Sequence, residues 1–246
     1  MRAACRVVGM HFPRSFRPWS ALALVALACA STPPAPSHGR GTLFGELRLV
    51  PHAGVTMPDA SDPSYQDRHM RDTRIFDYSR PGFAVVYLEG GAPPGERVDL
   101  VVRANEFETR IEPRWVALAA GGTVAVRNAT NEPHTLSCPS LSLVARLGPG
   151  ESLDVPAKTA GAHAVFLLDR PQVESGFFAA PGPYAVLTQD PRFELRDLPP
   201  GHFELRAWHP RLPPIAQPVD VVADQVVRVD LEMGVGRSRE ASDASR

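Results

Sequence analysis

Polar and apolar residues alternate along short segments, which is the pattern of strands with one buried face. In residues 42–50, small or apolar positions alternate with Phe44, Glu46 and Arg48. A repeat of two residues places successive side chains on opposite faces of a strand. The same alternation recurs in residues 225–233, and an unbroken apolar run fills residues 83–88. We therefore predict strands at all three places.

Shorter runs of the same kind fill the middle of the chain, separated by Gly-Gly and Pro-Gly turn signals at 121–122, 149–150 and 199–201. Regularly spaced short strands with such turns are typical of sandwiches and barrels. The predicted fold class is therefore all-β. The further strands that we predict cover residues 98–102, 114–119, 123–127, 152–156, 163–168, 184–188, 193–198 and 203–208.

Two segments lack this alternation. Residues 51–80 are polar, and we predict a long loop there with a short helix around residues 65–72. Its charged stretch, with His69 and Met70, is interpreted as solvated loop, the alternative being an insertion that binds a partner. Residues 235–246 have no apolar periodicity, so we predict a disordered tail.

The amino-terminal residues have the organisation of an export signal. Arginines precede an apolar run at residues 21–28, and no acidic residue occurs before Glu46. That run is shorter than the roughly 20 residues that span a bilayer. We therefore predict a signal peptide over residues 1–28, and export of the remaining chain.

The segment that follows, Leu27-Ala-Cys-Ala-Ser31, resembles the processing site of bacterial lipoproteins. The resemblance implies a lipid on Cys29 and makes the Pro- and Ser-rich residues 29–41 a tether. The protein would then lie in the periplasm or at a membrane surface of a bacterium, with the lipid as its only contact with the membrane. Ordinary cleavage after Ala30 remains the alternative.

Composition removes several classes of protein. The 246 residues include 26 prolines, about twice the usual share, which argues against a helical bundle because interior proline breaks helices. Three cysteines are too few for a disulfide framework or a four-thiolate zinc site. A net charge of −1 gives no general attraction to nucleic acid, so no nucleic-acid partner is expected.

Residues 93–182 resemble a cupredoxin, a Greek-key β-sandwich. The resemblance is carried by Gly121-Gly-Thr-Val124, by Asn128-Ala-Thr-Asn-Glu-Pro-His134 and by Leu147-Gly-Pro-Gly-Glu-Ser152. The spacing of the asparagine and the histidine, followed by Pro-Gly-x-Ser, is the more specific part.

Residues 183–234 are similar to a carboxypeptidase-regulatory-like, that is transthyretin-like, β-sandwich. Leu198-Pro-Pro-Gly-His-Phe-Glu-Leu205 and the closing Ala207-Trp-His209 carry this likeness. Bacterial envelope proteins, some labelled methylamine-utilisation-like or plastocyanin-like, join the two modules in this order. Residues 183–234 are too few for a whole sandwich, so we expect residues 42–92 to supply its first strands, with the cupredoxin-like segment inserted between.

Cupredoxins hold type 1 copper with two histidines, a cysteine and a weak axial ligand, often methionine. The resemblance assigns the first histidine to His134. Counting back from Tyr184 places the cysteine near Phe166 or Leu167, the second histidine near Arg170 and the methionine near Val173. None of these residues is such a ligand, so we predict a cupredoxin-like domain that has lost its metal site, with no cofactor.

One alternative keeps copper. His134 and Cys138 lie four residues apart and share a face of an extended segment, and His163 begins a predicted strand. These three residues would form a non-standard site. Otherwise Cys138 is a small buried hydrophobe, and the two histidines are ordinary polar residues at strand ends.

Motifs for catalysis are missing: there is no nucleophile elbow, P-loop, dinucleotide fingerprint or zinc-protease helix. We expect Trp208 to be a core residue rather than a surface that stacks on a ligand, and His209 to bond a neighbouring turn. The sequence thus predicts a non-catalytic envelope module that binds or scaffolds a protein or ligand it does not identify. The alternatives are a periplasmic copper-binding or electron-transfer protein and, less favoured, an enzyme with an unrecognised site.

Overall fold

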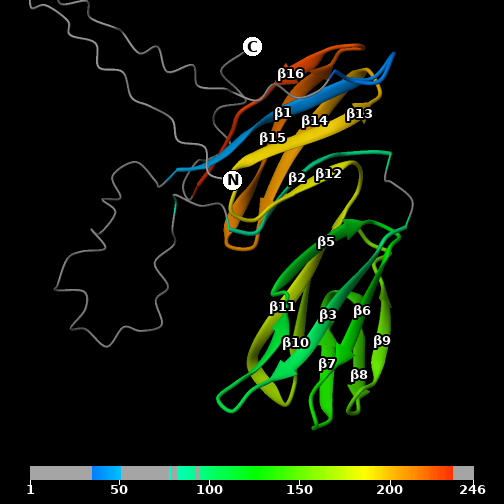
Figure 1. Ribbon diagram of the computed structural model, residues 1–246, viewed down its shortest axis with the longest axis vertical. Helices are drawn as coiled ribbons and strands as arrows, with labels where there is room; N and C mark the ends of the chain where they lie inside the picture. Colours follow the sequence, from blue (N-terminus) through cyan, green and yellow to red (C-terminus); the bar gives the residue numbers. More distant parts are fainter. Residues whose placement is uncertain (1–34, 51–77, 79–81, 92–94, 235–246) are drawn as a thin grey trace, which may run out of the picture. The chain divides into compact units, whose positions relative to one another are not determined.

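The computed structural model describes residues 35–50, 78, 82–91 and 95–234 (Figure 1). The regular structure of this part consists of strands β1–β17 and one 3-10 turn, η1 (Pro139–Leu141), so the all-β prediction is confirmed. The predicted signal peptide, Cys29, the helix and charged stretch of the long loop, and the tail lie outside the described residues.

The first and last strands of the chain form one sandwich, which we call the terminal sandwich. One sheet has the order β13-β1-β16, with β17 also paired to β1, and the second has the order β12-β2-β14-β15. The apolar side chains of both sheets form a single core. The strands are β1 (Gly41–Leu49), β2 (Ala84–Leu88), β12 (Tyr184–Leu187), β13 (Arg192–Leu198), β14 (Gly201–His209), β15 (Leu212–Val221), β16 (Val226–Arg228) and β17 (Leu231–Met233).

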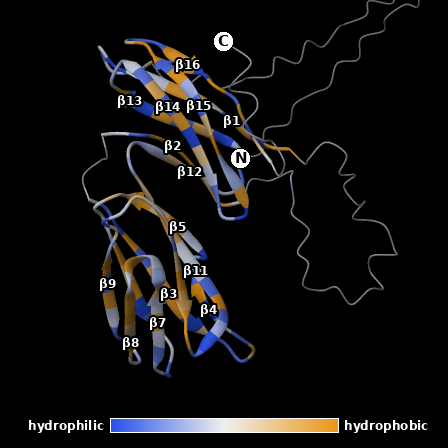
Figure 2. Cartoon of the chain, turned by 180° about the vertical axis from the view of Figure 1, so that it is seen from behind, coloured by the Kyte–Doolittle hydropathy of each residue, from blue (hydrophilic) through white to orange (hydrophobic). Residues whose placement is uncertain are grey.

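The strands in between form a second sandwich, which we call the central sandwich. Its sheets have the orders β5-β11-β10-β7-β8 and β4-β3-β6-β9. Hydrophobic and hydrophilic positions alternate along several of these strands (Figure 2), and the inward ones share one core. The strands are β3 (Arg97–Ala104), β4 (Thr109–Glu112), β5 (Trp115–Ala119), β6 (Thr123–Asn128), β7 (His134–Cys138), β8 (Leu143–Leu147), β9 (Ser152–Pro156), β10 (Gly161–Leu167) and β11 (Arg170–Ala180).

The pairing of β1 and β2 assigns the early strands to the terminal sandwich. Strand β1 runs antiparallel to β13 and parallel to β16 and β17. Strand β2 lies between β12 and β14, antiparallel to both. In the described part of the chain, β1 and β2 pair with no strand other than these. Strands β3–β11 are therefore inserted between the two halves of one sandwich.

Residues 225–233 form two strands rather than the single strand that the alternation predicts. The Val229 N–H donates to Phe44 O at 2.8 Å, while Asp230 accepts the Glu46 N–H through its side-chain Oδ1 at 3.1 Å. A carboxylate thus takes the place of a main-chain partner opposite β1. The backbone ladder is interrupted there and resumes at Leu231.

Five strands were not predicted from the pattern: β4, β7, β8, β11 and β15. Strand β15 contains Pro213, Pro214 and Pro218, which argues against a strand except at a sheet edge, and β15 is the edge strand of its sheet. Strand β11 occupies residues assigned to a ligand loop on the strength of the resemblance. That loop is replaced by a short turn at Leu168 and Asp169.

Strand β2 is buried on both faces. Ala84, Val86 and Leu88 enter the core of the terminal sandwich, while Val85 and Tyr87 join a third cluster that includes Phe178 of β11. Trp208 packs against this cluster. Its ring centroid lies 4.8 Å from that of Phe178 and 5.2 Å from that of Trp115. Trp208 is therefore partly buried against this cluster, on the opposite face of β14 from its alternating apolar neighbours.

Gly45 allows β1 to pass close to the chain between β16 and β17. A Cβ at this position would lie 1.8 Å from Val229 O, a distance that requires the backbone to move. We expect Gly45→Ala to lower the free energy of unfolding by about 1–3 kcal/mol, the usual cost of overpacking. Urea denaturation followed by circular dichroism measures it.

Gly95→Ala is the matched control, because its Cβ would make only an ordinary contact, 3.4 Å from Gly121 O. We expect this variant to stay within about 0.5 kcal/mol of the wild type. Equal effects of the two substitutions would contradict the close approach at Gly45.

Candidate functional site

His134 is buried at one end of the central sandwich, where β7 begins. Its side chain is 1% exposed. The Nδ1 atom lies 2.7 Å from Asp169 Oδ2, and the Nε2 atom lies 3.1 Å from Thr130 Oγ1. Strands β7 and β10 pair with Leu136 opposite Leu167, and continuing this register places Asp169 beside His134. Both ring nitrogens therefore have partners within the protein.

Asn128, the asparagine of the cupredoxin-like motif that ends at His134, is a structural residue. Its fully buried amide donates to the carbonyl oxygens of Glu132, Leu147 and Gly148 at 2.8–3.1 Å. Its Oδ1 accepts the N–H of Thr130 at 2.9 Å. One buried side chain thus ties the loop before β7 to the loop after β8, and this arrangement holds Thr130 beside the imidazole.

Asp169 is ionised more readily than an ordinary aspartate. Partial burial raises the pKa of Asp169. Hydrogen bonds from the Thr135 N–H, at 2.8 Å, and from His134 lower it by more than burial raises it, so the pKa lies below its usual value. An ionised carboxylate only accepts hydrogen bonds. His134 Nδ1 therefore carries a hydrogen and donates it to Asp169.

The positions counted as copper ligands lie on the paired strands β10 and β11, and none of them has a metal-ligating side chain. Leu167 and Val173 are buried in the core of the central sandwich. Phe166 is half-buried on β10, and Arg170 is exposed, with its guanidinium 3.2 Å from the Glu132 carboxylate. Across the described ranges, no three His, Cys, Asp or Glu side chains are grouped so that they could hold a metal ion.

Cys138 and His163 meet at a residue that the sequence analysis did not select, Ser140. The Ser140 Oγ lies 2.8 Å from His163 Nδ1 and 3.6 Å from Cys138 Sγ. His134 is at the other end of β7, four residues of extended chain from Cys138, or about 13 Å. The three residues of the alternative copper site are therefore divided between two separate polar clusters.

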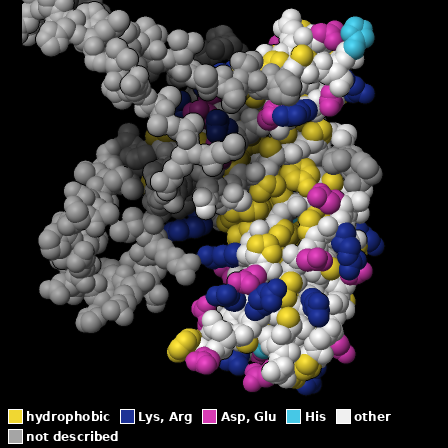
Figure 3. Space-filling model, in the orientation of Figure 1, with side chains coloured by type: hydrophobic (Ala, Val, Ile, Leu, Met, Phe, Trp, Pro, Cys, Tyr) yellow, Lys and Arg dark blue, Asp and Glu magenta, His cyan; other side chains and the backbone are white. Residues whose placement is uncertain are grey.

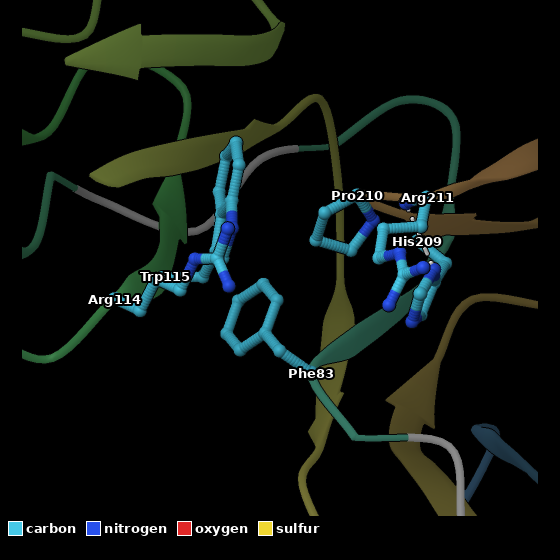
Figure 4. A pocket seen from close by; sticks show the side chains of 6 residues that line it. All are labelled: Phe83, Arg114, Trp115, His209, Pro210 and Arg211. Carbon is cyan, nitrogen blue, oxygen red and sulfur yellow. Dashed lines mark hydrogen bonds between the residues drawn. The ribbon is translucent and has the colours of Figure 1, made fainter. Parts of the chain in front are cut away.

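A pocket of about 320 Å³ is lined by residues of both sandwiches: Phe83, Arg114, Trp115, His209, Pro210 and Arg211 (Figure 4). His209 Nδ1 accepts the Arg211 N–H at 3.0 Å across the turn between β14 and β15, as predicted for His209. The sequence did not indicate the other lining residues, because their proximity depends on the packing of Trp115 against Phe83 and Trp208.

Charges of both signs are interspersed over the face seen in Figure 3. Exposed ion pairs of the described residues include Arg97 with Asp154 at 2.8 Å and Arg192 with Asp190 at 2.8 Å. The face in this view has no continuous positive patch of the kind that follows a phosphate backbone. No helix in the described part is long and apolar enough to cross a membrane.

Neither a family model nor a curated protein matches the sequence. The solved structures to which the chain is similar include a purple cupredoxin from Nitrosopumilus maritimus, at 12% identity with a TM-score of 0.31, covering 34% of this chain and 99% of that one. Amicyanin from Paracoccus versutus gives 13% identity and a TM-score of 0.31, covering 38% of this chain and 96% of that one.

The pair between His134 and Asp169 predicts a pH-dependent contribution to stability. Because the folded pKa of Asp169 is lowered, its contribution is present above the unfolded pKa of about 3.9 and is lost as pH falls through the folded value. We expect Asp169→Asn to cost about 1 kcal/mol at pH 7, a modest figure because solvent reaches this carboxylate. The difference from wild type should shrink below pH 4.

Urea denaturation between pH 2 and 7 tests this. Asp99→Asn, on the exposed side of β3, is the matched control and should change stability little at any pH. A destabilisation by Asp169→Asn that stays constant down to pH 2 would show that the charge of Asp169 is not involved.

Proposed function

We propose that this protein is a non-catalytic binding or scaffolding module of the bacterial cell envelope. In this proposal a lipid on Cys29 anchors it, and its central sandwich is cupredoxin-like but carries no type 1 copper. The sequence motifs from Gly121 to Ser152 support the cupredoxin-like assignment. The export signal and the sequence around Cys29 support the location.

The geometry of His134 carries the copper part of the proposal. A metal ion binds an unprotonated ring nitrogen, but Nδ1 donates its hydrogen to Asp169 and Nε2 is in contact with Thr130. Copper at Nδ1 would have to break a partly buried, charge-assisted hydrogen bond, the stronger kind, and copper at Nε2 would have to displace the Thr130 hydroxyl. The nearest chain segment offers the exposed Arg170, a cation, in place of a second ligand.

The binding part is supported by the pocket lined by Phe83 and Trp115. Its walls combine aromatic rings with polar side chains from the two sandwiches, and ligand sites commonly combine apolar walls with a few polar groups. Of the three tryptophans in the chain, Trp115 lines the pocket, Trp208 packs against Trp115, and Trp19 belongs to the predicted signal peptide. Intrinsic fluorescence of the processed protein therefore reports on the pocket.

Copper titration tests the metal part. We expect the purified protein to develop no intense visible thiolate-to-copper absorption when Cu²⁺ is added, and Cys138→Ala to give the same spectrum. An intense visible band that disappears in Cys138→Ala would overturn the proposal and favour the copper-binding or electron-transfer alternative.

Metabolic labelling tests the anchor. When the full chain is expressed in a bacterial host with a tagged fatty acid, we expect the label on the membrane-associated protein and none on Cys29→Ala. The control Cys5→Ala should keep the label, because Cys5 lies within the predicted signal peptide. An unlabelled wild-type protein that begins at Ser31 would establish ordinary cleavage instead.

A further inference from the structure

Ser140 is an exposed serine whose hydroxyl contacts a buried histidine, His163. It lies in η1, the short turn between β7 and β8. Strands β7 and β10 pair with Ser137 opposite Phe166, and continuing this register places Ser140 beside His163. The hydroxyl is thus within reach of solvent on one side, while its oxygen lies 2.8 Å from His163 Nδ1 on the other.

The partners of His163 determine which nitrogen carries its hydrogen. Nε2 lies 2.8 Å from the carbonyl oxygen of Thr159, and a carbonyl oxygen only accepts hydrogen bonds. In the neutral ring Nε2 is therefore protonated and Nδ1 has a free lone pair. The Ser140 hydroxyl must then be the donor, with its hydrogen directed at Nδ1.

The orientation of this pair is fixed by packing. The His163 side chain is 3% exposed, and its ring stacks on that of Phe177, with centroids 4.7 Å apart and planes 24° apart. Cys138 Sγ lies 3.6 Å from Ser140 Oγ. Since the only hydrogen of the serine hydroxyl is directed at His163, the thiol is the donor in this contact.

We propose that Ser140 is a nucleophile activated by His163, able to accept an acyl or phosphonyl group from an activated ester or fluoride. A serine hydroxyl hydrogen-bonded to a histidine that is itself held by a third group is the arrangement that activates serine in acyl transfer. Here a backbone carbonyl replaces the usual carboxylate. This reactivity is additional to the proposed binding function and independent of it.

The reaction balances without a cofactor. With a fluorophosphonate, Ser140 Oγ attacks phosphorus, the O–P bond forms, the P–F bond breaks and fluoride leaves. The hydroxyl proton passes to His163 Nδ1, and Nε2–H of the resulting imidazolium remains bonded to Thr159 O. One group is consumed per chain, so the result is a covalent modification of Ser140 rather than turnover.

A fluorophosphonate probe, followed by peptide mass spectrometry of the full chain, tests the proposal. We expect one label per chain, on Ser140, no label at this site in Ser140→Ala, and labelling at least tenfold slower in His163→Gln. Ser175→Ala is the matched control: the Ser175 hydroxyl donates to Arg114 O at 2.8 Å, with no imidazole, and this variant should label like the wild type. Cys138→Ala should keep its label, since the thiol is not the group that reacts.

The pH dependence of labelling separates activation from a merely structural contact without relying on a variant that could unfold. Activation by a single general base predicts a rate that rises with pH and then reaches a plateau. A serine without a base instead reacts in proportion to hydroxide, with no plateau. Labelling elsewhere than Ser140, equal rates in a folded His163→Gln, or a rate without a plateau would each overturn the proposal.

Discussion

The burial of both faces of strand β2 is the constraint on which the arrangement of the described chain depends. Its five residues are all buried, so β2 needs apolar partners on two sides. The terminal sandwich supplies one side, and the aromatic cluster around Phe178 and Trp208 supplies the other. Each fully buried aliphatic or aromatic side chain contributes about 1.5–3 kcal/mol, so this short strand ties together segments that are distant in sequence. The pocket beside Trp115 is a consequence, because its lining residues come from the strands that β2 brings together.

Buried polar groups impose the second constraint, since each must find a partner or lose the free energy of its hydration. Asn128, His134 and His163 are almost completely buried, and each has protein partners for its polar side-chain atoms. The partners of the two histidines lie outside the strands: Thr130 and Asp169 at one end of β7, Ser140 and Thr159 at the other. The loops of the central sandwich are therefore held by side-chain hydrogen bonds as well as by strand ladders.

Alternation along the chain predicted the strands whose faces differ most in polarity, such as β1 and β9, because the repeat of two is a local property. It failed where contacts between segments distant in sequence determine whether a strand forms. Strand β15 contains prolines that only an edge position tolerates, and the break at Asp230 depends on the neighbouring Glu46 N–H. For the site, the resemblance selected His134, and residue type together with spacing along the chain selected Cys138 and His163. It could not select Asp169 or Ser140, because these become neighbours only through the register of β7 against β10.

The two buried histidines differ in chemistry because their partners differ. At His134 the partner of Nδ1 is an ionised carboxylate, which forces that nitrogen to be the donor of a charge-assisted hydrogen bond. At His163 the partner of Nε2 is a carbonyl oxygen, which makes the other nitrogen the acceptor and directs a hydroxyl hydrogen toward it. Two residues of the same type, similarly buried and one strand apart, thus have opposite tautomers. A histidine in a sequence indicates a site, but the proton on its ring is decided by atoms that only the folded chain brings near.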